Sequence, residues 1–268
     1  MSNFNLTAGT DTFTGTAGEQ NTFFFTPSTL QPTDTVTGGA TGGFVDVLSL
    51  TAGGTITAGQ FAGVTRMEEL DLSAAGNSVT LTNGLVAATS TGQFTVRDGG
   101  GDDVVDGSAI NNGIGVVVQA AAGNDTFKGG AGNDIFFFAP SDLTSGDTVV
   151  GGAGVDTIWL TAAGVVTASA FTNVTGTEAL VLAGGNIVTL SDQLVASSDN
   201  GQFVVTALGG DNVANGILVN NHTIVFNAGS GTDIFSGGPA MIHSYLEPWP
   251  IWRLVTCLRA APASIPSG

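Results

Sequence analysis

The sequence is poor in charge, and the charges that it has are almost all of one sign. Lys and Arg total 5 whereas Asp and Glu total 22, which gives a formal net charge of −17. Five cations are too few to form the basic surface that binds nucleic acid or an anionic membrane. The composition therefore predicts no nucleic-acid partner.

Cysteine and long apolar runs are also scarce. Cys257 is the single cysteine, so an internal disulfide or a cysteine-ligated zinc site is excluded. The longest apolar runs, such as 115–118 and 135–139, are far shorter than a membrane span, and no basic-then-apolar leader opens the chain. A hydrophobic content of 42% and a mean hydropathy of +0.32 favour a folded core over disorder.

The sequence is rich in glycine and in internal repetition. Gly accounts for 41 of 268 residues. The segment 10–15, Thr-Asp-Thr-Phe-Thr-Gly, returns as Asn-Asp-Thr-Phe-Lys-Gly at 124–129 and as Thr-Asp-Ile-Phe-Ser-Gly at 232–237. Such a repeat predicts two copies of a unit of about 110 residues, the first at 1–120 and the second at 121–238.

A shorter period lies inside each copy. Short runs of Val, Ile, Thr and Phe between Gly, Asn and Asp predict strands. Five periods of 22 residues fill one copy, so the nested periods predict an all-β fold, a parallel β-solenoid or β-roll of two tandem copies. The acidic residues that mark the period are Asp103, Asp125 and Asp147 in one series and Asp134, Asp156 and Glu178 in the other.

The segment 239–268 differs in composition from the rest of the chain. It contains the only Cys, the only Tyr and two of the three Trp. If one base was lost after Gly238, the restored frame permits Gly-Asp-Asp-Thr-Phe-Ile-Phe, which matches Gly-Asn-Asp-Ile-Phe-Phe-Phe at 132–138. We therefore predict that 239–268 is an unstructured or incidental frameshift product; the alternative is a docking tail.

Glycine-rich loops carry the acidic residues. Residues 129–137 (Gly-Gly-Ala-Gly-Asn-Asp-Ile-Phe-Phe) and 151–159 (Gly-Gly-Ala-Gly-Val-Asp-Thr-Ile-Trp) fit the pattern Gly-Gly-x-Gly-x-Asp-x-apolar-x. Weaker matches lie at 98–106, 120–128 and 228–236. The pattern resembles the RTX, or hemolysin-type, calcium-binding nonapeptide repeat. This resemblance implies Ca²⁺ as the cofactor, held between the turns of successive coils.

The resemblance also assigns candidate ligands. Calcium takes six to eight oxygen ligands, from carboxylates and backbone carbonyls. The pairs Asp134 with Asp156 and Asp125 with Asp147 are the favoured carboxylates. The alternative is that the Asp side chains only cap turns by accepting backbone hydrogen bonds. The remaining candidates are the turn residues and the Asp residues of the weaker matches: Gly130, Gly132, Asn133, Gly152, Gly154, Asp103 and Asp233.

The predicted function is structural and not enzymatic. The sequence has no His-Glu-x-x-His helix and no Gly-x-Ser-x-Gly elbow. We expect a calcium-binding structural or adhesive module that folds or rigidifies on binding Ca²⁺ and contacts cell-surface or matrix components. The resemblance implies type I secretion and an extracellular or cell-surface location.

Two alternatives stay open. The chain could be the RTX accessory region of a larger secreted enzyme or toxin. It could also be a Thr-rich ice- or surface-binding solenoid, because Thr33 and Thr35 precede Thr55 and Thr57 by 22 residues.

Overall fold

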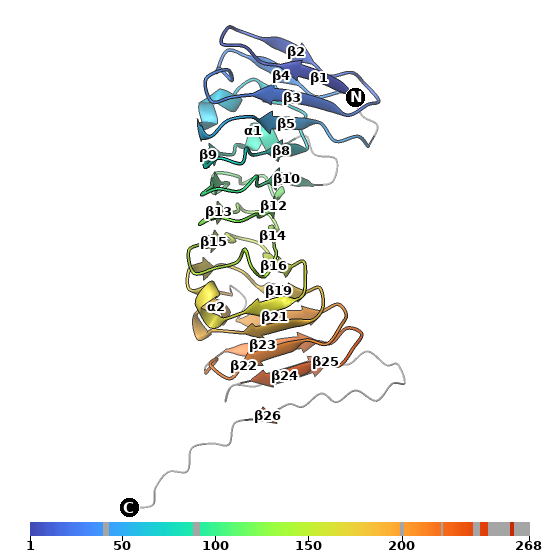
Figure 1. Cartoon of the computed structure of the whole chain (residues 1–268), viewed down its shortest axis with the longest axis vertical. Coiled ribbons are helices and arrows are strands. Elements are labelled where there is room, and N and C mark those ends of the chain that lie inside the picture. The colour runs from blue at the N-terminus through green and yellow to red at the C-terminus, as the bar shows by residue number, and fades with distance from the viewer. Residues whose placement is uncertain are drawn as a thin grey trace, which may run out of the picture. The chain divides into compact units, whose positions relative to one another are not determined.

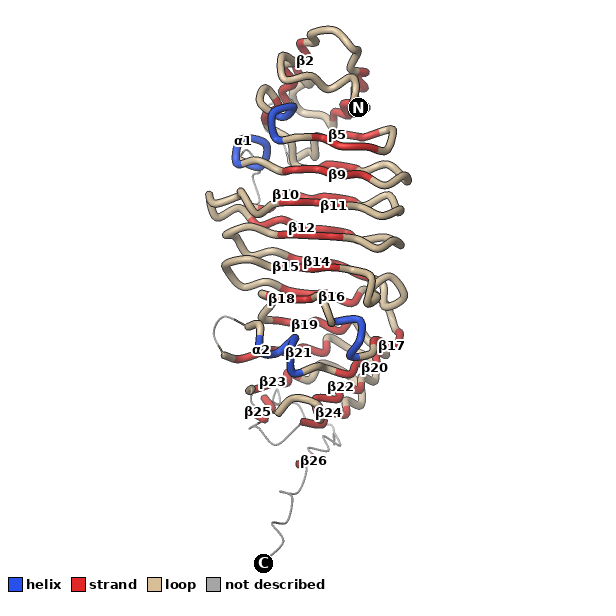
Figure 2. The backbone as a smooth tube through the Cα atoms, turned by 90° about the vertical axis from the view of Figure 1, so that its left-hand side faces the viewer, coloured by secondary structure: helices blue, strands red, loops and turns tan. Residues whose placement is uncertain are grey.

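The computed structural model describes residues 1–39, 43–87, 92–198, 201–220 and 222–237, and the backbone of 242–245 and 258–259. Packing divides the chain into two compact units. The first comprises Met1–Phe137 and Gly146–Asp156, and the second comprises Phe138–Ser145 and Thr157–Gly268. Within each unit, successive strands stack in parallel as the coils of a β-solenoid (Figures 1 and 2). The predicted fold class is confirmed.

In the first unit, one long parallel sheet receives one strand from each coil. Neighbouring strands in this sheet are separated in sequence by strands of other sheets, which is the connectivity of a solenoid. The strands, in order, are β1 (Ser2–Asn5), β3 (Asn21–Phe25), β5 (Val47–Leu50), β8 (Glu69–Asp71), β10 (Gln93–Arg97), β12 (Gly115–Gln119) and β14 (Ile135–Phe138).

Two shorter sheets complete the coils of the first unit. The first of them contains β2 (Thr12–Thr14), β4 (Thr35–Thr37) and β7 (Val64–Thr65). The second contains β6 (Gly54–Ile56), β9 (Asn77–Thr80), β11 (Val104–Asp106), β13 (Thr126–Lys128) and β15 (Thr148–Val150).

The second unit repeats this plan. Its long sheet contains β16 (Thr157–Leu160), β19 (Ala179–Leu182), β21 (Gln202–Ala207), β23 (Thr223–Asn227) and β25 (Ile242–Tyr245). Its other strands are β17 (Gly164–Val166), β18 (Val174–Thr175), β20 (Asn186–Thr189), β22 (Val213–Gly216), β24 (Ile234–Gly237) and β26 (Leu258–Arg259).

Among the described residues, four short helices interrupt the strands, and the sequence did not predict them. The 3-10 helix η1 (Ala58–Phe61) recurs as η2 (Ala168–Phe171), and α1 (Asn83–Val86) recurs as α2 (Asp192–Ala196). Each element thus returns at the corresponding place of the second copy, as a tandem duplication requires. In the part of the chain that the structure describes, no helix has the length and hydropathy to span a membrane.

The core is a stack of apolar side chains that point inward from the same position of each strand. Parallel in-register pairing places these residues directly above one another, so each coil buries its neighbours. In the first unit this row is Phe23, Leu48, Leu70, Val96, Val118 and Phe136, and each is at most 1% exposed.

The coils differ in length. Asp46 and Glu68, which hydrogen-bond across adjacent coils, are separated by the predicted 22 residues. Asn77 and Asp103, which also hydrogen-bond across adjacent coils, are 26 residues apart, and helix α1 between them takes up the additional length. The coil that leads from β12 to β14 has only 18 residues. A uniform coil length is therefore wrong for part of the solenoid, because loops and short helices absorb insertions between fixed strands.

The register also corrects the expected stacking of threonines. Thr35 pairs with Thr12, and Thr37 pairs with Thr65. Thr55 pairs instead with Ser78. Strand β7, and not β6, follows β4 in its sheet, so the expected stack of Thr33 and Thr35 on Thr55 and Thr57 is wrong.

The structure describes little of the segment 239–268. The backbone of β25 pairs with β23, and that of β26 pairs with β24. The rest of the segment lies outside the described residues. Its assignment as a frameshift product stays a prediction, as do the boundaries of the sequence copies at 120 and 238.

Candidate metal centre

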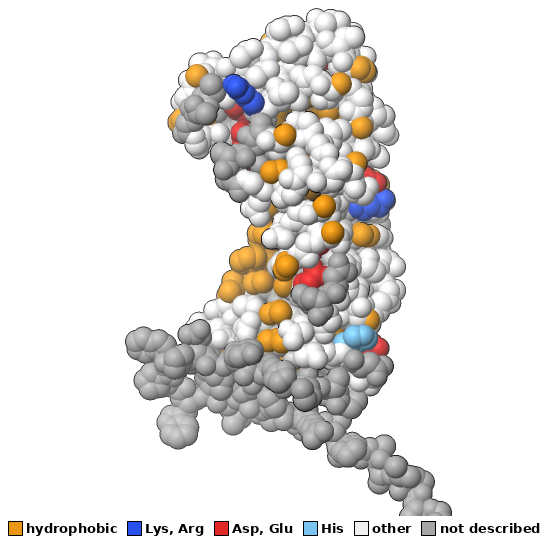
Figure 3. Space-filling view, turned by 180° about the vertical axis from the view of Figure 1, so that it is seen from behind, with side chains coloured by type: hydrophobic (Ala, Val, Ile, Leu, Met, Phe, Trp, Pro, Cys, Tyr) orange, Lys and Arg blue, Asp and Glu red, His pale blue; other side chains and the backbone are white. Residues whose placement is uncertain are grey.

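Polar side chains form a ladder where the strands β9, β11, β13 and β15 begin. Asn77, Asp103, Asp125 and Asp147 lie on successive coils, and none is more than 3% exposed. Asp134 and Asp156 form a second ladder before β14 and β16 and are completely buried. On the face drawn in Figure 3, only isolated acidic side chains reach the surface.

Each Asp rung accepts a hydrogen bond from the backbone of the preceding coil. The N–H of Asp103 donates to Asp125 Oδ1 at 2.9 Å, and the N–H of Asp125 donates to Asp147 Oδ1 at 2.8 Å. The N–H of Asp134 donates to Asp156 Oδ1 at 2.7 Å. The structure thus brings together both predicted pairs. One oxygen of each acceptor caps a turn, which is the alternative role left open by the sequence.

The second carboxylate oxygen distinguishes the rungs. The Oδ2 atoms of Asp103, Asp125 and Asp233 are buried and have no hydrogen-bond partner among the described residues. In Asp134, by contrast, Oδ1 accepts from the N–H of Val116 at 2.5 Å and Oδ2 accepts from the N–H of Gly130 at 2.8 Å. A buried carboxylate oxygen without a donor is costly. Asp103, Asp125 and Asp233 therefore need a positive partner more than Asp134 does.

Asp98 joins two of these rungs. Carboxylate oxygens of Asp98, Asp103 and Asp125 lie within 4.8 Å of one another. Asp98 is oriented by the N–H groups of Gly100 and Ala121, both at 2.9 Å. Sequence reasoning missed this residue because it stands where the motif has its first glycine. The available signal was that an acidic residue replaces that glycine five positions before a ladder Asp.

The electrostatics of the cluster favour a cation. Burial, with the nearby Asp98 carboxyl, raises the pKa of Asp103 to about 7. Burial also raises the pKa of Asp125 to about 7, and the charges of Asp98 and Asp147 add to this effect. Neither Asp103 nor Asp125 forms an ion pair with a basic side chain in the described ranges. A divalent cation would supply the missing positive charge.

A close backbone approach brings a further oxygen to the cluster. A Cβ on Gly123 would lie 2.1 Å from the carbonyl oxygen of Gly101 and 2.6 Å from Asp125 Oδ1. Only a glycine at this position lets the carbonyl and the carboxylate come so near. Carboxylates and carbonyls are the oxygen ligands of Ca²⁺, whereas structural zinc sites are built from Cys and His. The residues present therefore fit calcium.

The glycines of the two strongest motifs stack on one another. Gly152 and Gly154 have φ of +117° and +130°. A Cβ on Gly152 would lie 2.2 Å from the Gly130 carbonyl oxygen, and one on Gly154 would lie 2.3 Å from that of Gly132. These four residues thus shape stacked turns. Their role as carbonyl ligands stays a prediction.

Asn133 has a different environment from the ladder residues. Its side chain is exposed, and its Oδ1 accepts from the N–H of Val155 at 2.9 Å. Asn133 lines a polar depression of about 280 Å³ that has no carboxylate in its lining. The residues that line this depression are Gly92, Gln93, Gly113, Gly115, Ala131, Gly132 and Asn133.

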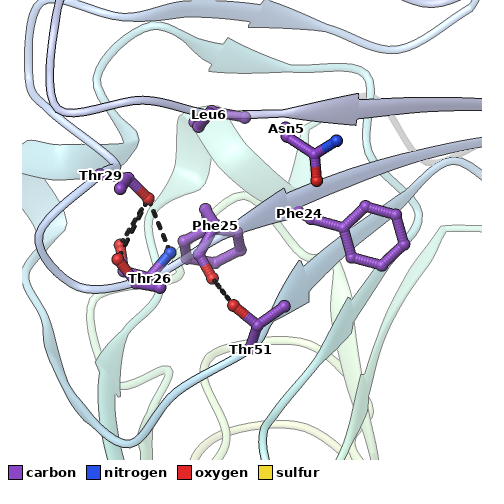
Figure 4. Close-up of a pocket in the computed structure, with 7 residues that line it drawn as sticks. All are labelled: Asn5, Leu6, Phe24, Phe25, Thr26, Thr29 and Thr51. Carbon is purple, nitrogen blue, oxygen red and sulfur yellow. Dashed lines mark hydrogen bonds between the residues drawn. The ribbon is translucent and has the colours of Figure 1, made fainter.

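A second pocket lies near the start of the first unit (Figure 4). Its volume is about 310 Å³, and it is lined by the apolar side chains of Leu6, Phe24 and Phe25 together with Asn5, Thr26, Thr29 and Thr51. Its polar groups bond to one another, since Thr51 Oγ1 donates to the Phe25 carbonyl at 3.0 Å and the Thr26 N–H donates to Thr29 Oγ1 at 2.8 Å. Its lining contains no acidic residue, so this pocket offers no carboxylate to a calcium ion.

Stacked parallel coils with buried carboxylates on glycine turns define a calcium-binding β-solenoid. Residues 117–139 and 144–162 match the family model of the RTX calcium-binding nonapeptide repeat, in four copies. The chain therefore carries RTX repeats, as the motif resemblance indicated, and calcium is the ion that these repeats bind. The match contains Asp125, Asp134, Asp147 and Asp156, whereas Asp98, Asp103 and Asp233 lie outside it. Searches of curated proteins and of solved structures gave no match.

Proposed function

We propose that the first unit binds Ca²⁺ at the cluster of Asp98, Asp103 and Asp125, and that binding is coupled to the ordering of the surrounding coils. The observation that carries this proposal is the convergence of the three carboxylates within 4.8 Å, two of them with a buried Oδ2 that has no donor. Without a cation, these like charges repel in a desolvated site. With calcium bound, the binding free energy becomes folding free energy.

The remaining ladder residues extend this proposal along the chain. Asp147, Asp134 and Asp156 in the first unit and Asp233 in the second are further candidate ligands, each at most 2% exposed. Ten acidic residues are buried in the described part of the chain, which has few cations to neutralise them. We place the chain as a non-catalytic structural or adhesive module outside the cell, where calcium is abundant enough for weak sites. Its RTX repeats and its acidic composition support this placement.

A calcium titration of the full-length chain tests the proposal. Isothermal calorimetry would count the ions, and far-UV circular dichroism in chelator and in calcium would follow folding. We expect the β signal to increase at roughly 10⁻⁴–10⁻³ M calcium, the range of extracellular modules. A complete β signal in chelator, with no heat of calcium binding, would contradict the proposal.

Asp98→Gly restores the glycine of the motif. It removes the one carboxylate of the three-residue cluster that does not belong to the ladder. We expect the affinity of one ion to fall at least about tenfold, which corresponds to about 1.4 kcal/mol. Asp102→Asn is the matched control, because Asp102 lies in the same turn but is exposed. An Asp98→Gly chain with unchanged calcium affinity would exclude Asp98 as a ligand.

A further inference from the structure

At three rungs the side chain is an asparagine whose amide is surrounded by oxygens. Asn212 is completely buried. Its Nδ2 donates to the carbonyl oxygens of Gly209 and Gly210 at 3.0 and 3.1 Å. It also donates to Asp233 Oδ1, on the next coil, at 3.0 Å. Two turn carbonyls and one carboxylate therefore enclose the amide nitrogen.

The same arrangement occurs twice in the first unit. Asn77 Nδ2 donates to the carbonyls of Ser73 and Ala75 and, at 2.7 Å, to Asp103 Oδ1. Asn21 Nδ2 likewise donates at 2.7 Å to Asp46 Oδ1, and also to two carbonyls of its own turn. Carbonyls can only accept, so the partners fix which end of each amide carries the hydrogens.

Aspartate rungs present an oxygen where these amides present hydrogens. Asn212 Oδ1 accepts from the N–H of Asn186 at 3.0 Å, just as Asp103 Oδ1 accepts from the N–H of Asn77 at 2.6 Å. The Oδ2 of such an Asp therefore corresponds to the Nδ2 of Asn212. In Asp103, as in Asp125 and Asp233, this Oδ2 is buried and has no donor among the described residues. The amide hydrogens of the Asn side chain carry partial positive charge toward the surrounding oxygens, and the Asp side chain has no such hydrogens.

We propose that the choice between Asn and Asp on the ladder determines which coils require calcium. A rung with Asn is closed by its own amide and orders without a metal. A rung whose Asp has no donor at Oδ2 among the described residues, as in Asp103, Asp125 and Asp233, is isosteric but needs a cation at the position that the amide hydrogens fill. This inference rests on the proposed calcium binding. It adds that the coils with Asn77 and Asn212 become ordered without calcium. Exchanging Asn and Asp would move the calcium requirement along the solenoid.

Asn77→Asp tests this inference in the full-length chain. The new carboxylate would face two carbonyls and Asp103, so we expect the variant to be less stable than the wild type in chelator. In calcium we expect calorimetry to show one additional ion per chain and thermal unfolding to return to the wild-type midpoint. Asn77→Ala is the matched control. It removes the same three hydrogen bonds, and also the one that Asn77 Oδ1 accepts from Ser73 Oγ, without adding a carboxylate, so calcium should not restore its stability.

Asp125→Asn is the reverse exchange and keeps the shape of the rung. We expect it to bind at least one ion fewer than the wild type and to unfold at a higher temperature in chelator. This variant still tests the inference if Asn77→Asp does not fold. An Asp125→Asn chain that is less stable than the wild type in chelator would overturn the inference.

The results separate this inference from the proposed function. A wild-type chain that gives no heat with calcium contradicts the proposed function itself. A wild-type chain that binds calcium, with a folded Asn77→Asp variant that binds the same number of ions and stays destabilised, overturns only the inference.

Discussion

At the scale of the residue, the chemistry of the site depends on one oxygen of each aspartate. Oδ1 of Asp125 has a backbone donor from the coil before it, whereas Oδ2 has none in the described part of the chain. Burial favours the neutral acid in such a place, so the pKa values of Asp103 and Asp125 rise to about 7. At the proposed calcium site, a proton and calcium would therefore compete for the same atoms.

This competition gives opposite pH dependences with and without calcium. The two carboxyls bind a proton more tightly in the folded chain than in the unfolded chain, where the pKa of Asp is about 3.9. In chelator, the free energy of unfolding should then fall as the pH rises from about 4 to about 7. Calcium needs deprotonated ligands, so its affinity should rise over the same range. Urea denaturation at pH 5 and pH 8, in chelator and in saturating calcium, measures both.

Replacing both acids provides the control for this prediction. In Asp103→Asn combined with Asp125→Asn, the pH dependence in chelator should flatten between pH 5 and pH 8. A slope as steep as that of the wild type would show that other groups, and not these two carboxyls, take up the protons.

At the scale of the element, the turns between the strands position the carboxylates of the proposed calcium site. The loop that ends in Asp103 stacks on the loop that ends in Asp125, and the Ala122 carbonyl accepts from the Gly101 N–H at 3.0 Å. Gly101 has φ of +95°, in the region that favours glycine. At position 123 glycine is needed for a different reason, because a side chain there would collide with the Gly101 carbonyl and with Asp125. Sterics at one position thus keep the two coils as close together as the proposed calcium site requires.

Gly123→Ala should disrupt this contact. A methyl group there would lie 2.1 Å from a backbone oxygen, so one coil must shift. We expect a loss of about 1–3 kcal/mol in the free energy of unfolding, together with weaker calcium binding. Urea denaturation in saturating calcium measures the first quantity, and calorimetry measures the second.

Gly84→Ala is the control for the glycine substitution. Gly84 lies in α1, and its new Cβ would be 3.9 Å from Thr82 Oγ1, an ordinary contact. Alanine should stabilise the chain there by about 0.4–1 kcal/mol, since it restricts the unfolded state. Equal destabilisation by both substitutions would show that the effect at Gly123 is not specific to the stacked loops.

At the scale of the whole molecule, the two copies carry different ladders. The rungs Asn77, Asp103 and Asp125 of the first copy correspond to Asn186, Asn212 and Asp233 of the second. The first unit therefore concentrates buried carboxylates on its middle coils, whereas the second has an amide at two of the three positions. The two copies share the same fold, but they differ in how many buried carboxylates on the ladder need a positive partner.

Hydrogen exchange followed by mass spectrometry should reveal this difference. In chelator, the amides of β11 and β13 should exchange faster than in calcium, because their rungs lack a positive partner. The amides of β20 and β22 should keep their protection, because Asn186 and Asn212 begin these coils. Uniform loss of protection over both units in chelator would contradict a calcium requirement that is set rung by rung.

The sequence by itself determined the solenoid and the identity of its acidic ladders. A fixed period that places an apolar residue two positions after each Asp can bury its apolar residues only by stacking copies of the coil. Phe127 and Phe136, each two positions after an Asp of the glycine-rich motifs, are indeed completely buried. The spacing therefore predicted the fold class, and it predicted that Asp125 stacks on Asp147 and Asp134 on Asp156.

Tertiary structure alone decided which carboxylate oxygens have donors. The partners of each rung come from a neighbouring coil, and coil length varies with insertions such as α1 that follow no period. For this reason the sequence counted Asp134 among the favoured ligands, although both of its oxygens accept backbone hydrogen bonds. It passed over Asp98, which breaks the motif but lies beside Asp103 and Asp125 in space. Periodicity fixes which residues share a ladder, whereas hydrogen-bond satisfaction depends on atoms that only the stacked coils bring together.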